Sequence, residues 1–253
     1  MQLPLLRQLQ KRKWIIEMSK YKIADMRLAA AADFGRNGKR VADIGTDHAS
    51  LPIYLVGNGF SPYAVACDIN IGPLNAAKHN IASAKLSDKI DVLLTDGLNG
   101  VDSYLPEDIY ILGMGGELIL RIIDESEYTR KSGVRLILQP MTHANDLRSG
   151  LYSIGFDIVD ETLVRDRDRV YQIIVAEFDG VKRSATDVEL WLGKKNIKKG
   201  GSDLNNIAGV YARALKKKID GCANSGSVDP ETVSLYEQFK LLSESMEMGN
   251  DCT

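Results

Sequence analysis

Short runs of apolar residues alternate with longer stretches of mixed polarity through the first two thirds of this chain. The apolar runs fall at 41–45, 63–67, 90–94, 109–112 and 134–138. The longer stretches have helical spacing at 50–58, 72–85, 117–125 and 144–153, and residues 1–37 are also predicted to be helical. Strands that alternate with helices in this way predict a parallel sheet covered by helices.

The pattern changes after residue 153. Residues 156–164 and 170–178 are two consecutive predicted strands, and the charged turn 165–169 joins them. A hairpin that follows five strand–helix units adds an antiparallel strand to the parallel sheet. This order predicts an α/β fold of the Rossmann-like class I methyltransferase type, with a seven-stranded and mostly parallel sheet.

From about Ser184 onward the strands stop, and three helices are predicted at 185–199, 203–221 and 230–248. Their apolar residues recur at helical spacing and are expected to form the seam of an antiparallel helical hairpin or coiled coil: Ile207, Val210, Tyr211, Ala214, Leu215, Leu235, Phe239, Leu242 and Met246. The predicted domains are a basic extension at 1–22, a cofactor-binding methyltransferase domain at 23–181 and a helical hairpin at 182–253.

Charge is unevenly distributed along the 253 residues, although the net charge is only −2. Residues 1–22 hold six Lys or Arg against one Glu, and residues 182–218 hold ten against three acids. Basic arms on an acidic body are typical of enzymes that grip the phosphates of a nucleic acid. Solvated helix faces are the plainer explanation for any one lysine run.

Several classes of protein do not fit the composition. No apolar run is long enough to span a membrane, and no signal peptide is expected. The cysteines Cys67, Cys222 and Cys252 lie far apart, so neither a zinc site nor a disulfide framework is predicted. His79 and His143 are isolated and are expected at the surface or at helix caps. We therefore expect a cytoplasmic, monomeric protein without a metal ion or a membrane partner.

The segment Val41-Ala42-Asp43-Ile44-Gly45-Thr46-Asp47-His48-Ala49 combines a buried strand, an acidic turn and the start of a helix. Such a junction forms the nucleotide site of doubly wound folds. A dinucleotide site needs G-x-G-x-x-G, but here Asp47 and Ala49 follow Gly45 at alternate positions. A pyrophosphate would meet a carboxylate, whereas a cationic cofactor would be attracted. The turn therefore favours S-adenosylmethionine, a sulfonium with an ammonium group, over a nicotinamide dinucleotide.

Acidic residues also end the next two predicted strands. Asp68 lies 23 residues after Gly45, where a carboxylate can accept both ribose hydroxyl protons. Asp96-Gly97 ends the third strand, and a carboxylate beside a free backbone N–H can read an adenine ring. Each acid alone is weak evidence, because Asp is common in turns. Three acids on successive strand ends indicate one cofactor site at the carboxyl edge of the sheet.

The fourth predicted strand ends in Gly113-Met114-Gly115-Gly116. These glycines either let the next helix pack close to the sheet or form a floor for a flat target base, and the second reading is favoured because the acceptor usually faces this strand. Methyltransferases that act on exocyclic amino groups carry Asn/Asp-Pro-Pro-Tyr/Phe at this point. Its absence argues against methylation of an exocyclic amino group.

Together these motifs resemble the TrmK family, bacterial tRNA methyltransferases that modify N1 of the adenine at position 22. The resemblance is carried by Asp43 to Pro52, Asp68, Asp96-Gly97-Leu98, Gly113 to Gly116 and Ile137-Leu138-Gln139-Pro140, and it covers roughly residues 26–178. It implies S-adenosylmethionine as the cofactor and tRNA as the partner. The implied cofactor-binding residues are Arg27, Leu28, Asp43, Gly45, Thr46, Asp47, His48, Asp68, Ile69, Asp96, Gly97, Leu98 and Gly113.

A methyl transfer to N1 of adenine needs alignment rather than a strong base, because N1 already carries an in-plane lone pair. Asp47 is the candidate catalytic residue, since a carboxylate would stabilise the cationic product ring or accept an amino proton. The candidate substrate-binding residues are Gly113, Met114, Gly115, Gly116, Gln139, Pro140, Lys194, Lys195, Lys198, Lys199, Lys216, Lys217 and Lys218. The alternatives are a methyltransferase for another RNA or a small molecule, and a non-catalytic tRNA-binding relative.

Overall fold

The computed structural model describes residues 20–223 and 229–244. Seven strands form a sheet in the order β3-β2-β1-β4-β5-β7-β6. The sheet is mostly parallel, and β7 runs antiparallel to both β5 and β6. The chain divides within strand β4 into two compact units, residues 1–111 and 112–253, which are described in turn. The sequence prediction of a seven-stranded Rossmann-like sheet with a closing hairpin is confirmed.

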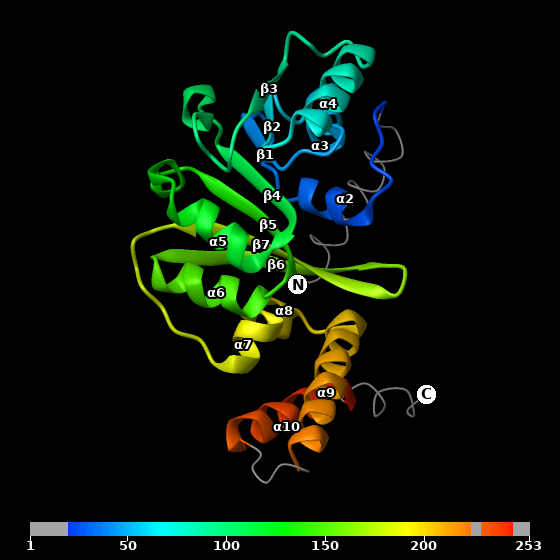
Figure 1. The fold of residues 1–253 in the computed structure, drawn as a ribbon, viewed down its shortest axis with the longest axis vertical. Coiled ribbons are helices and arrows are strands. Elements are labelled where there is room, and N and C mark those ends of the chain that lie inside the picture. The colour runs from blue at the N-terminus through cyan, green and yellow to red at the C-terminus, as the bar shows by residue number, and fades with distance from the viewer. Residues whose placement is uncertain (1–19, 224–228, 245–253) are drawn as a thin grey trace, which may run out of the picture. The chain divides into compact units, whose positions relative to one another are not determined.

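The first unit follows the predicted strand–helix alternation closely (Figure 1). Its elements are α2 Met26–Ala32, β1 Val41–Ile44, α3 Ser50–Gly57, β2 Ala64–Asp68, α4 Ile71–Ser83, β3 Ile90–Leu94 and the start of β4 Asp108–Gly115. All four residues of β1 and the first four of β2 are buried. These two strands are covered on both faces, which explains why their sequences are apolar without alternation.

The prediction that residues 1–37 are helical is wrong for the described part, because only α2 is helical there. Asp25 starts this helix, since its side chain accepts hydrogen bonds from the backbone N–H groups of Arg27 and Leu28. After the helix the chain passes so close to Tyr110 that a Cβ on Gly35 would lie 2.2 Å from the tyrosine oxygen. Residues 1–19, most of the predicted basic extension, lie outside the described residues.

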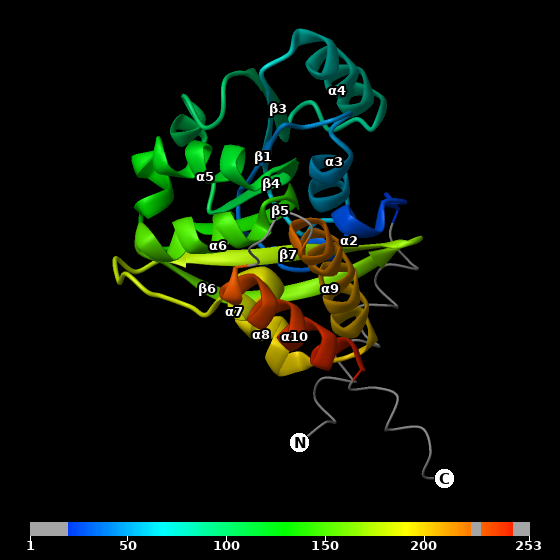
Figure 2. The same cartoon turned by 60° about the horizontal axis from the view of Figure 1, so that its bottom comes forward.

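The second unit contains the rest of the sheet and six further helices among the described residues. Its elements are α5 Gly116–Asp124, β5 Arg135–Thr142, α6 Ala144–Ser153, β6 Phe156–Asp166, β7 Arg169–Phe178, α7 Asp187–Leu192, α8 Lys194–Lys199, α9 Ser202–Ala223 and α10 Pro230–Glu244. Helices α5 and α6 lie side by side, and α9 packs against α10 (Figures 1 and 2). Both β4 and β5 extend beyond their predicted ends and take in Gly113 to Gly115 and Gln139-Pro140.

The single helix predicted at 185–199 is instead two helices, α7 and α8, which meet at Gly193. This glycine has φ of +88°, and a Cβ added to it would lie 2.5 Å from the carboxylate oxygens of Glu161. Only glycine fits a left-handed backbone pressed against a buried side chain. The break therefore depends on a residue of β6, which local helical spacing does not reveal.

A small apolar core holds the last helices together. Its buried members are Leu192, Leu204, Ile207, Ala208, Ala212, Leu235 and Phe239, with Tyr211, Leu215 and Leu242 packed against it. Most of the predicted seam is therefore present between α9 and α10. Val210 and Ala214 are exceptions, because Val210 is 45% exposed and Ala214 also faces solvent. Met246 lies outside the described residues. No helix in the described part of the chain is both long and apolar enough to cross a membrane.

Candidate functional site

The turn after β1 is locked to the end of β2. The Cys67 carbonyl oxygen accepts hydrogen bonds from two successive backbone N–H groups, those of Gly45 (2.9 Å) and Thr46 (2.7 Å). Gly45 has φ of +75°, and Thr46 is 1% exposed. The Thr46 hydroxyl donates to Asp43 Oδ2 at 2.7 Å. Backbone and side-chain bonds thus fix the position of the Asp43 carboxyl group at the carboxyl edge of the sheet.

Asp43 is an unusual acid because it is 8% exposed and has no cationic partner among the contacts described for it. Burial raises its pKa to about 6, the neighbouring Asp68 adds to the rise, and the Thr46 hydrogen bond opposes it. A buried carboxyl group with a pKa near 6 would bind a cation strongly, because the cation relieves the cost of the buried charge. This is the electrostatic property expected at the amino group of a zwitterionic cofactor.

Two strained residues follow this turn. His48 and Ala49 have φ of +59° and +54°, and Ala49 is the N-cap of α3. Left-handed conformations of non-glycine residues cost about 1–3 kcal/mol each and cluster at functional sites. The Nδ2 group of Asn80 donates to the His48 carbonyl oxygen at 3.0 Å and ties the turn to α4. This hydrogen bond was not predicted, because Asn80 lies within an ordinary amphipathic helix, α4.

Asp47 and His48 form an exposed pair on this turn. The His48 Nε2 atom lies 3.1 Å from Asp47 Oδ1, and the side chains are 59% and 79% exposed, respectively. The Asp47 carboxylate therefore faces solvent and is accessible to a ligand, whereas Asp43 is enclosed. The two acids of the motif occupy different environments, consistent with different roles.

The register of the first three strands sets the other predicted acids at the same edge. Ile44 pairs with Cys67, and Asp68 pairs with Leu94, so the strands end nearly level. Asp68 Oδ1 accepts a hydrogen bond from the backbone N–H of Asn70 at 2.7 Å. Asp96 lies two residues beyond the end of β3 and is followed by Gly97, whose φ is +57°.

Two apolar side chains accompany these acids. Ile69 is 61% exposed directly after β2, and Leu94 is 55% exposed at the end of β3. Leu98, in contrast, is 8% exposed and packs inward. Exposed apolar side chains next to carboxylates suit a flat ring such as adenine. Ile69 was among the predicted residues, but Leu94 was missed because it belongs to the apolar run that defines its strand.

Arg27 and Leu28 lie in the first turn of α2. The Arg27 guanidinium forms an ion pair with Asp25, which also caps the helix through its backbone bonds. Leu28 is half-buried. Their contact with the cofactor remains a prediction.

In the second unit, the glycine motif combines packing with open space. Gly116 is buried at the start of α5, and a Cβ there would lie 2.2 Å from the His143 carbonyl oxygen. A Cβ on Gly115 would lie 3.4 Å from Thr142 Oγ1, whereas Gly113 has φ of +77° and no heavy atom within 4 Å of that point. Gly116 therefore serves close packing, and Gly113 leaves free surface at the strand end. A contact with a target base remains a prediction for Gly113 to Gly116.

Gln139 and Pro140 are both buried. The Gln139 amide donates to the Pro140 carbonyl oxygen at 2.8 Å and contacts the Met141 sulfur at 3.5 Å. These contacts shape the last residues of β5. A direct contact of Gln139 or Pro140 with substrate remains a prediction.

His143 lies at the surface and at a helix cap, as predicted, but it is not isolated. It is the N-cap of α6, and its Nδ1 atom lies 2.9 Å from Asp146 Oδ2 and 3.9 Å from Glu117 Oε1. The hydrogen bond to Asp146, reinforced by Glu117, raises the pKa of His143. One ligand atom from each of the three residues lies within 4.8 Å of the others, a spacing that a metal ion could use. The N-termini of α5 and α6 both point here, however, and their partial positive charge disfavours a cation.

The predicted lysines differ in their surroundings. Lys199 is ion-paired with Asp160 at 2.6 Å, and Lys216 with Asp220 at 2.7 Å. The Asp220 hydrogen bond raises the pKa of Lys216. Lys195 is half-buried, and its backbone N–H donates to Glu161 Oε2 at 3.1 Å. Lys194 is exposed, but its Nζ atom lies 3.8 Å from Glu189 Oε1. Lys198, Lys217 and Lys218 are exposed and are the better candidates for phosphate contacts.

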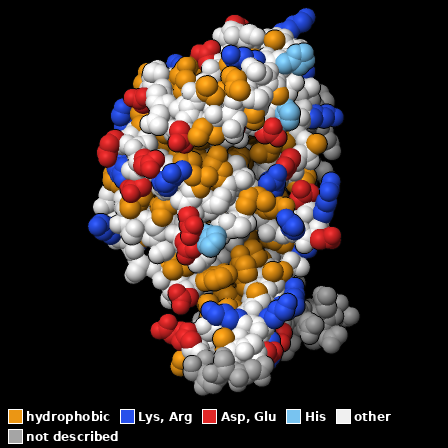
Figure 3. Space-filling model, in the orientation of Figure 1, with side chains coloured by type: hydrophobic (Ala, Val, Ile, Leu, Met, Phe, Trp, Pro, Cys, Tyr) orange, Lys and Arg blue, Asp and Glu red, His pale blue; other side chains and the backbone are white. Residues whose placement is uncertain are grey.

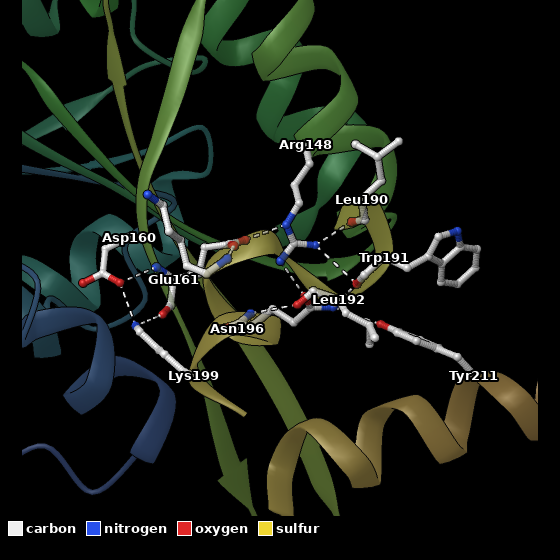
Figure 4. Close-up of polar contacts among 11 residues, drawn as sticks. Arg148, Asp160, Glu161, Leu190, Trp191, Leu192, Asn196, Lys199 and Tyr211 are labelled. Carbon is white, nitrogen blue, oxygen red and sulfur yellow. Dashed lines mark hydrogen bonds and ion pairs between the residues drawn. The ribbon is translucent and has the colours of Figure 1, made fainter. Parts of the chain in front are cut away.

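A buried polar network surrounds Arg148 in α6, and no sequence pattern predicted it (Figure 4). The side chains of Arg148 and Glu161 are both 0% exposed, and Arg148 Nε donates to Glu161 Oε1 at 2.6 Å. The other guanidinium nitrogens donate to the Leu190 carbonyl oxygen (2.8 Å) and to Gln172 Oε1 (2.6 Å). One arginine thus joins α6 to β6, β7 and α7. An arginine on a surface helix is ordinarily solvated, so its pattern gave no signal.

The chain is similar to known methyltransferases over most of its length. The family described as "Methyltransferase domain" matches residues 24–174. The tRNA (adenine(22)-N(1))-methyltransferase of Bacillus subtilis (strain 168) is 32% identical over 235 residues, which cover 88% of this chain and 97% of that protein. The solved structure of B. subtilis M1A22 tRNA methyltransferase TrmK matches with a TM-score of 0.78 and 27% identity, over 89% of this chain and 99% of that chain. M. capricolum TrmK in complex with S-adenosyl-homocysteine, its natural cofactor product, matches with a TM-score of 0.71 and 26% identity. The match covers 88% of this chain and 97% of that chain.

Proposed function

The chain belongs to the family of tRNA (adenine(22)-N(1))-methyltransferases, and we propose that it transfers a methyl group from S-adenosylmethionine to N1 of adenine 22 in tRNA. The observation that carries the proposal is the acidic end of β1 and the turn after it, in which Asp43 is enclosed and an accessible Asp47 stands where a dinucleotide site has a glycine. We further propose that the protein acts in the cytoplasm, where its tRNA substrate is found.

The residues at the carboxyl edge fit S-adenosylmethionine. Asp43 offers a buried carboxyl group for the cofactor's ammonium, and Asp68 offers an acceptor for ribose hydroxyls. Ile69 and Leu94 expose apolar surface for the adenine ring, beside Asp96 and Gly97. When bound, the cofactor supplies an electrophilic methyl group on a sulfonium.

The chain's own contribution is alignment and charge. N1 of adenine lies on the pairing edge, so the base must be unpaired or flipped before it reacts. Methylation leaves a positive charge on the ring, which a carboxylate can stabilise while it accepts an amino proton. We assign this role to Asp47, because its side chain is the exposed acid of the turn.

The function is tested by incubating the protein with methyl-labelled S-adenosylmethionine and an unmodified tRNA transcript. We expect label in 1-methyladenine, located at position 22 by nuclease digestion and mass spectrometry. Label on another nucleoside would redirect the assignment to another RNA site, and label that requires no RNA would indicate a small-molecule substrate.

The same assay with Asp47→Asn tests the catalytic assignment. We expect a turnover loss of about 10²–10⁴-fold at saturating tRNA and cofactor, the usual contribution of a positioned acid–base group. Cofactor and tRNA affinities should change little, because Asn keeps the size of the side chain. Full turnover by this variant would remove Asp47 from the mechanism.

We also propose that the exposed lysines of α8 and α9 contact tRNA phosphates. In Lys217→Glu/Lys218→Glu, tRNA binding should weaken, and the slope of log K against log salt should fall by about 1 for each lost contact. The measurement is tRNA affinity across a salt series, with cofactor affinity expected to stay constant. The control Lys78→Glu/Lys89→Glu makes the same charge change on exposed residues of the first unit. Equal losses of tRNA affinity in the two double variants would indicate a general electrostatic attraction rather than contacts of Lys217 and Lys218 with phosphates.

A further inference from the structure

A groove in the second unit lies beside the predicted acceptor residues. It is formed where the carboxyl end of β5, the β6–β7 hairpin and α9 meet, and its volume is about 260 Å³. Pro140, one of the predicted substrate residues, lines one end. The groove therefore begins at the strand end where the acceptor base is expected.

The floor of this groove consists of polar side chains that hydrogen bonds hold in fixed orientations. Gln172 is 4% exposed, and its Oε1 atom accepts the 2.6 Å hydrogen bond from Arg148. Its Nε2 atom donates to the Tyr211 hydroxyl at 2.9 Å, so the buried network fixes the tyrosine that lines the groove (Figure 4). Floor residues with fixed orientations provide hydrogen-bonding groups at little entropic cost.

The walls of the groove combine polar side chains with accessible apolar ones. Met141 is 42% exposed and Val210 is 45% exposed, and Tyr171 of β7 also lines the groove. In Figure 3, hydrophobic side chains gather in the region between α8 and α9, with Lys and Arg side chains at the border. Val210 belongs to the apolar repeat of α9 but does not enter the α9–α10 core, so its surface is available to a partner.

We propose that this groove holds one unpaired nucleobase of the tRNA, a direct neighbour of the methylated adenine. The inference rests on the proposed function. Unpaired bases bind proteins by stacking on aromatic and apolar side chains while their edges hydrogen-bond to fixed polar groups. Tyr171, Val210 and Met141 provide the first surface. The Tyr211 hydroxyl, which Gln172 holds in place, provides the second.

Charge at the rim favours a nucleotide over a second protein chain. Arg169 and Asp168 are exposed side by side where the hairpin lines the groove, and Lys217 and Lys218 lie about two turns along α9 from Val210, so basic side chains outnumber the acid. A base in the groove would leave its phosphate at the arginine. A flipped adenine also unstacks its neighbour, which creates the free base that the groove accepts.

The test combines a protein variant with altered tRNA. Val210→Glu places a negative charge in the groove, and the matched control Val233→Glu makes the same change at an exposed position of α10. Transcripts carry a single abasic residue immediately before or after position 22. We expect Val210→Glu to raise the KM for intact tRNA about tenfold with little change in kcat, the usual value of one stacked base, while Val233→Glu resembles the wild type.

The decisive result is the combination of the two changes. One abasic transcript should raise the wild-type KM by a similar factor and raise the Val210→Glu KM no further, because both remove the same contact. Additive effects for both transcripts, or equal KM values for the two valine variants, would overturn the groove assignment. A Val210→Glu effect on self-association alone would make the groove a protein interface and would also overturn it. Failure of the wild type to methylate intact tRNA would overturn the proposed function instead.

Discussion

Arg148→Met should lower the free energy of unfolding by about 3–5 kcal/mol, the cost of leaving a buried charge without its partner. Methionine is about as long as the aliphatic part of the arginine side chain, but it cannot donate to the Glu161 carboxylate. That carboxylate then keeps the hydrogen bond from the Lys195 backbone N–H. The Leu190 carbonyl oxygen and Gln172 Oε1 also lose a donor. Urea unfolding measures the change as a shift of the midpoint at constant slope.

A second variant separates the charge from the shape. In Arg148→Met/Glu161→Gln the buried charge is gone, and the loss should be smaller than in the single variant. The control Arg165→Met breaks an ion pair with Asp203 whose partners are 42% and 33% exposed, so its cost should stay below about 1 kcal/mol. Similar losses for Arg148→Met and Arg165→Met would show that the network contributes no more than a surface pair.

This network also determines which truncations are informative. The carbonyl groups of Leu190 and Trp191 and the N–H of Lys195 complete it, and all three lie in the predicted hairpin domain 182–253. Removing residues 184–253 would therefore expose Arg148 and Glu161 and disturb β6 as well as tRNA binding. Surface substitutions on α9 test the tRNA contacts without this side effect, while the domain boundaries at 22/23 and 181/182 remain predictions.

The order of strands and helices was predictable because it depends on local signals. β3 Ile90–Leu94 and α6 Ala144–Ser153 have the predicted bounds, since an apolar run or a helical repeat ends at a turn residue in each case. The break at Gly193 was not predictable, because it depends on Glu161, 32 residues earlier. The same holds for Val210, whose spacing fits the seam although the α9–α10 packing leaves it outside.

The candidate site divides in a similar way. The positions of Asp43, Asp68 and Asp96 followed from strand ends, because parallel strands bring their carboxyl ends to one edge. Their exposure and the raised pKa of Asp43 did not follow, because these depend on what packs around each side chain. Two acids four residues apart, Asp43 and Asp47, are alike in sequence, yet one is enclosed and the other is open to solvent.

Asp43→Asn should make the cofactor-free protein more stable and the enzyme less able to bind its cofactor. The raised pKa means that the folded state keeps a proton that the unfolded state releases between about pH 4 and pH 6. The free energy of unfolding of the wild type therefore falls as the pH rises through this window, and the deficit is complete above it. Asn cannot ionise and still accepts the Thr46 hydrogen bond, so it should gain on the order of 1–3 kcal/mol above pH 6.

Cofactor binding should respond in the opposite direction. An ionised Asp43 attracts the ammonium group, so wild-type affinity for S-adenosylmethionine should fall as the pH drops below about 6, where the carboxyl group takes up its proton. Asp43→Asn should bind about 10- to 100-fold more weakly at pH 7.5, the value of a hydrogen bond to a charged group, and should lack this pH dependence. Calorimetric titrations from pH 5 to pH 8 measure both effects, with urea unfolding at each pH.

Asp88→Asn, at an exposed acid before β3, should match the wild type in both assays. A variant that gained no stability while losing affinity would show that Asp43 is already ionised and compensated in the free protein, and the buried-acid account of this turn would fail.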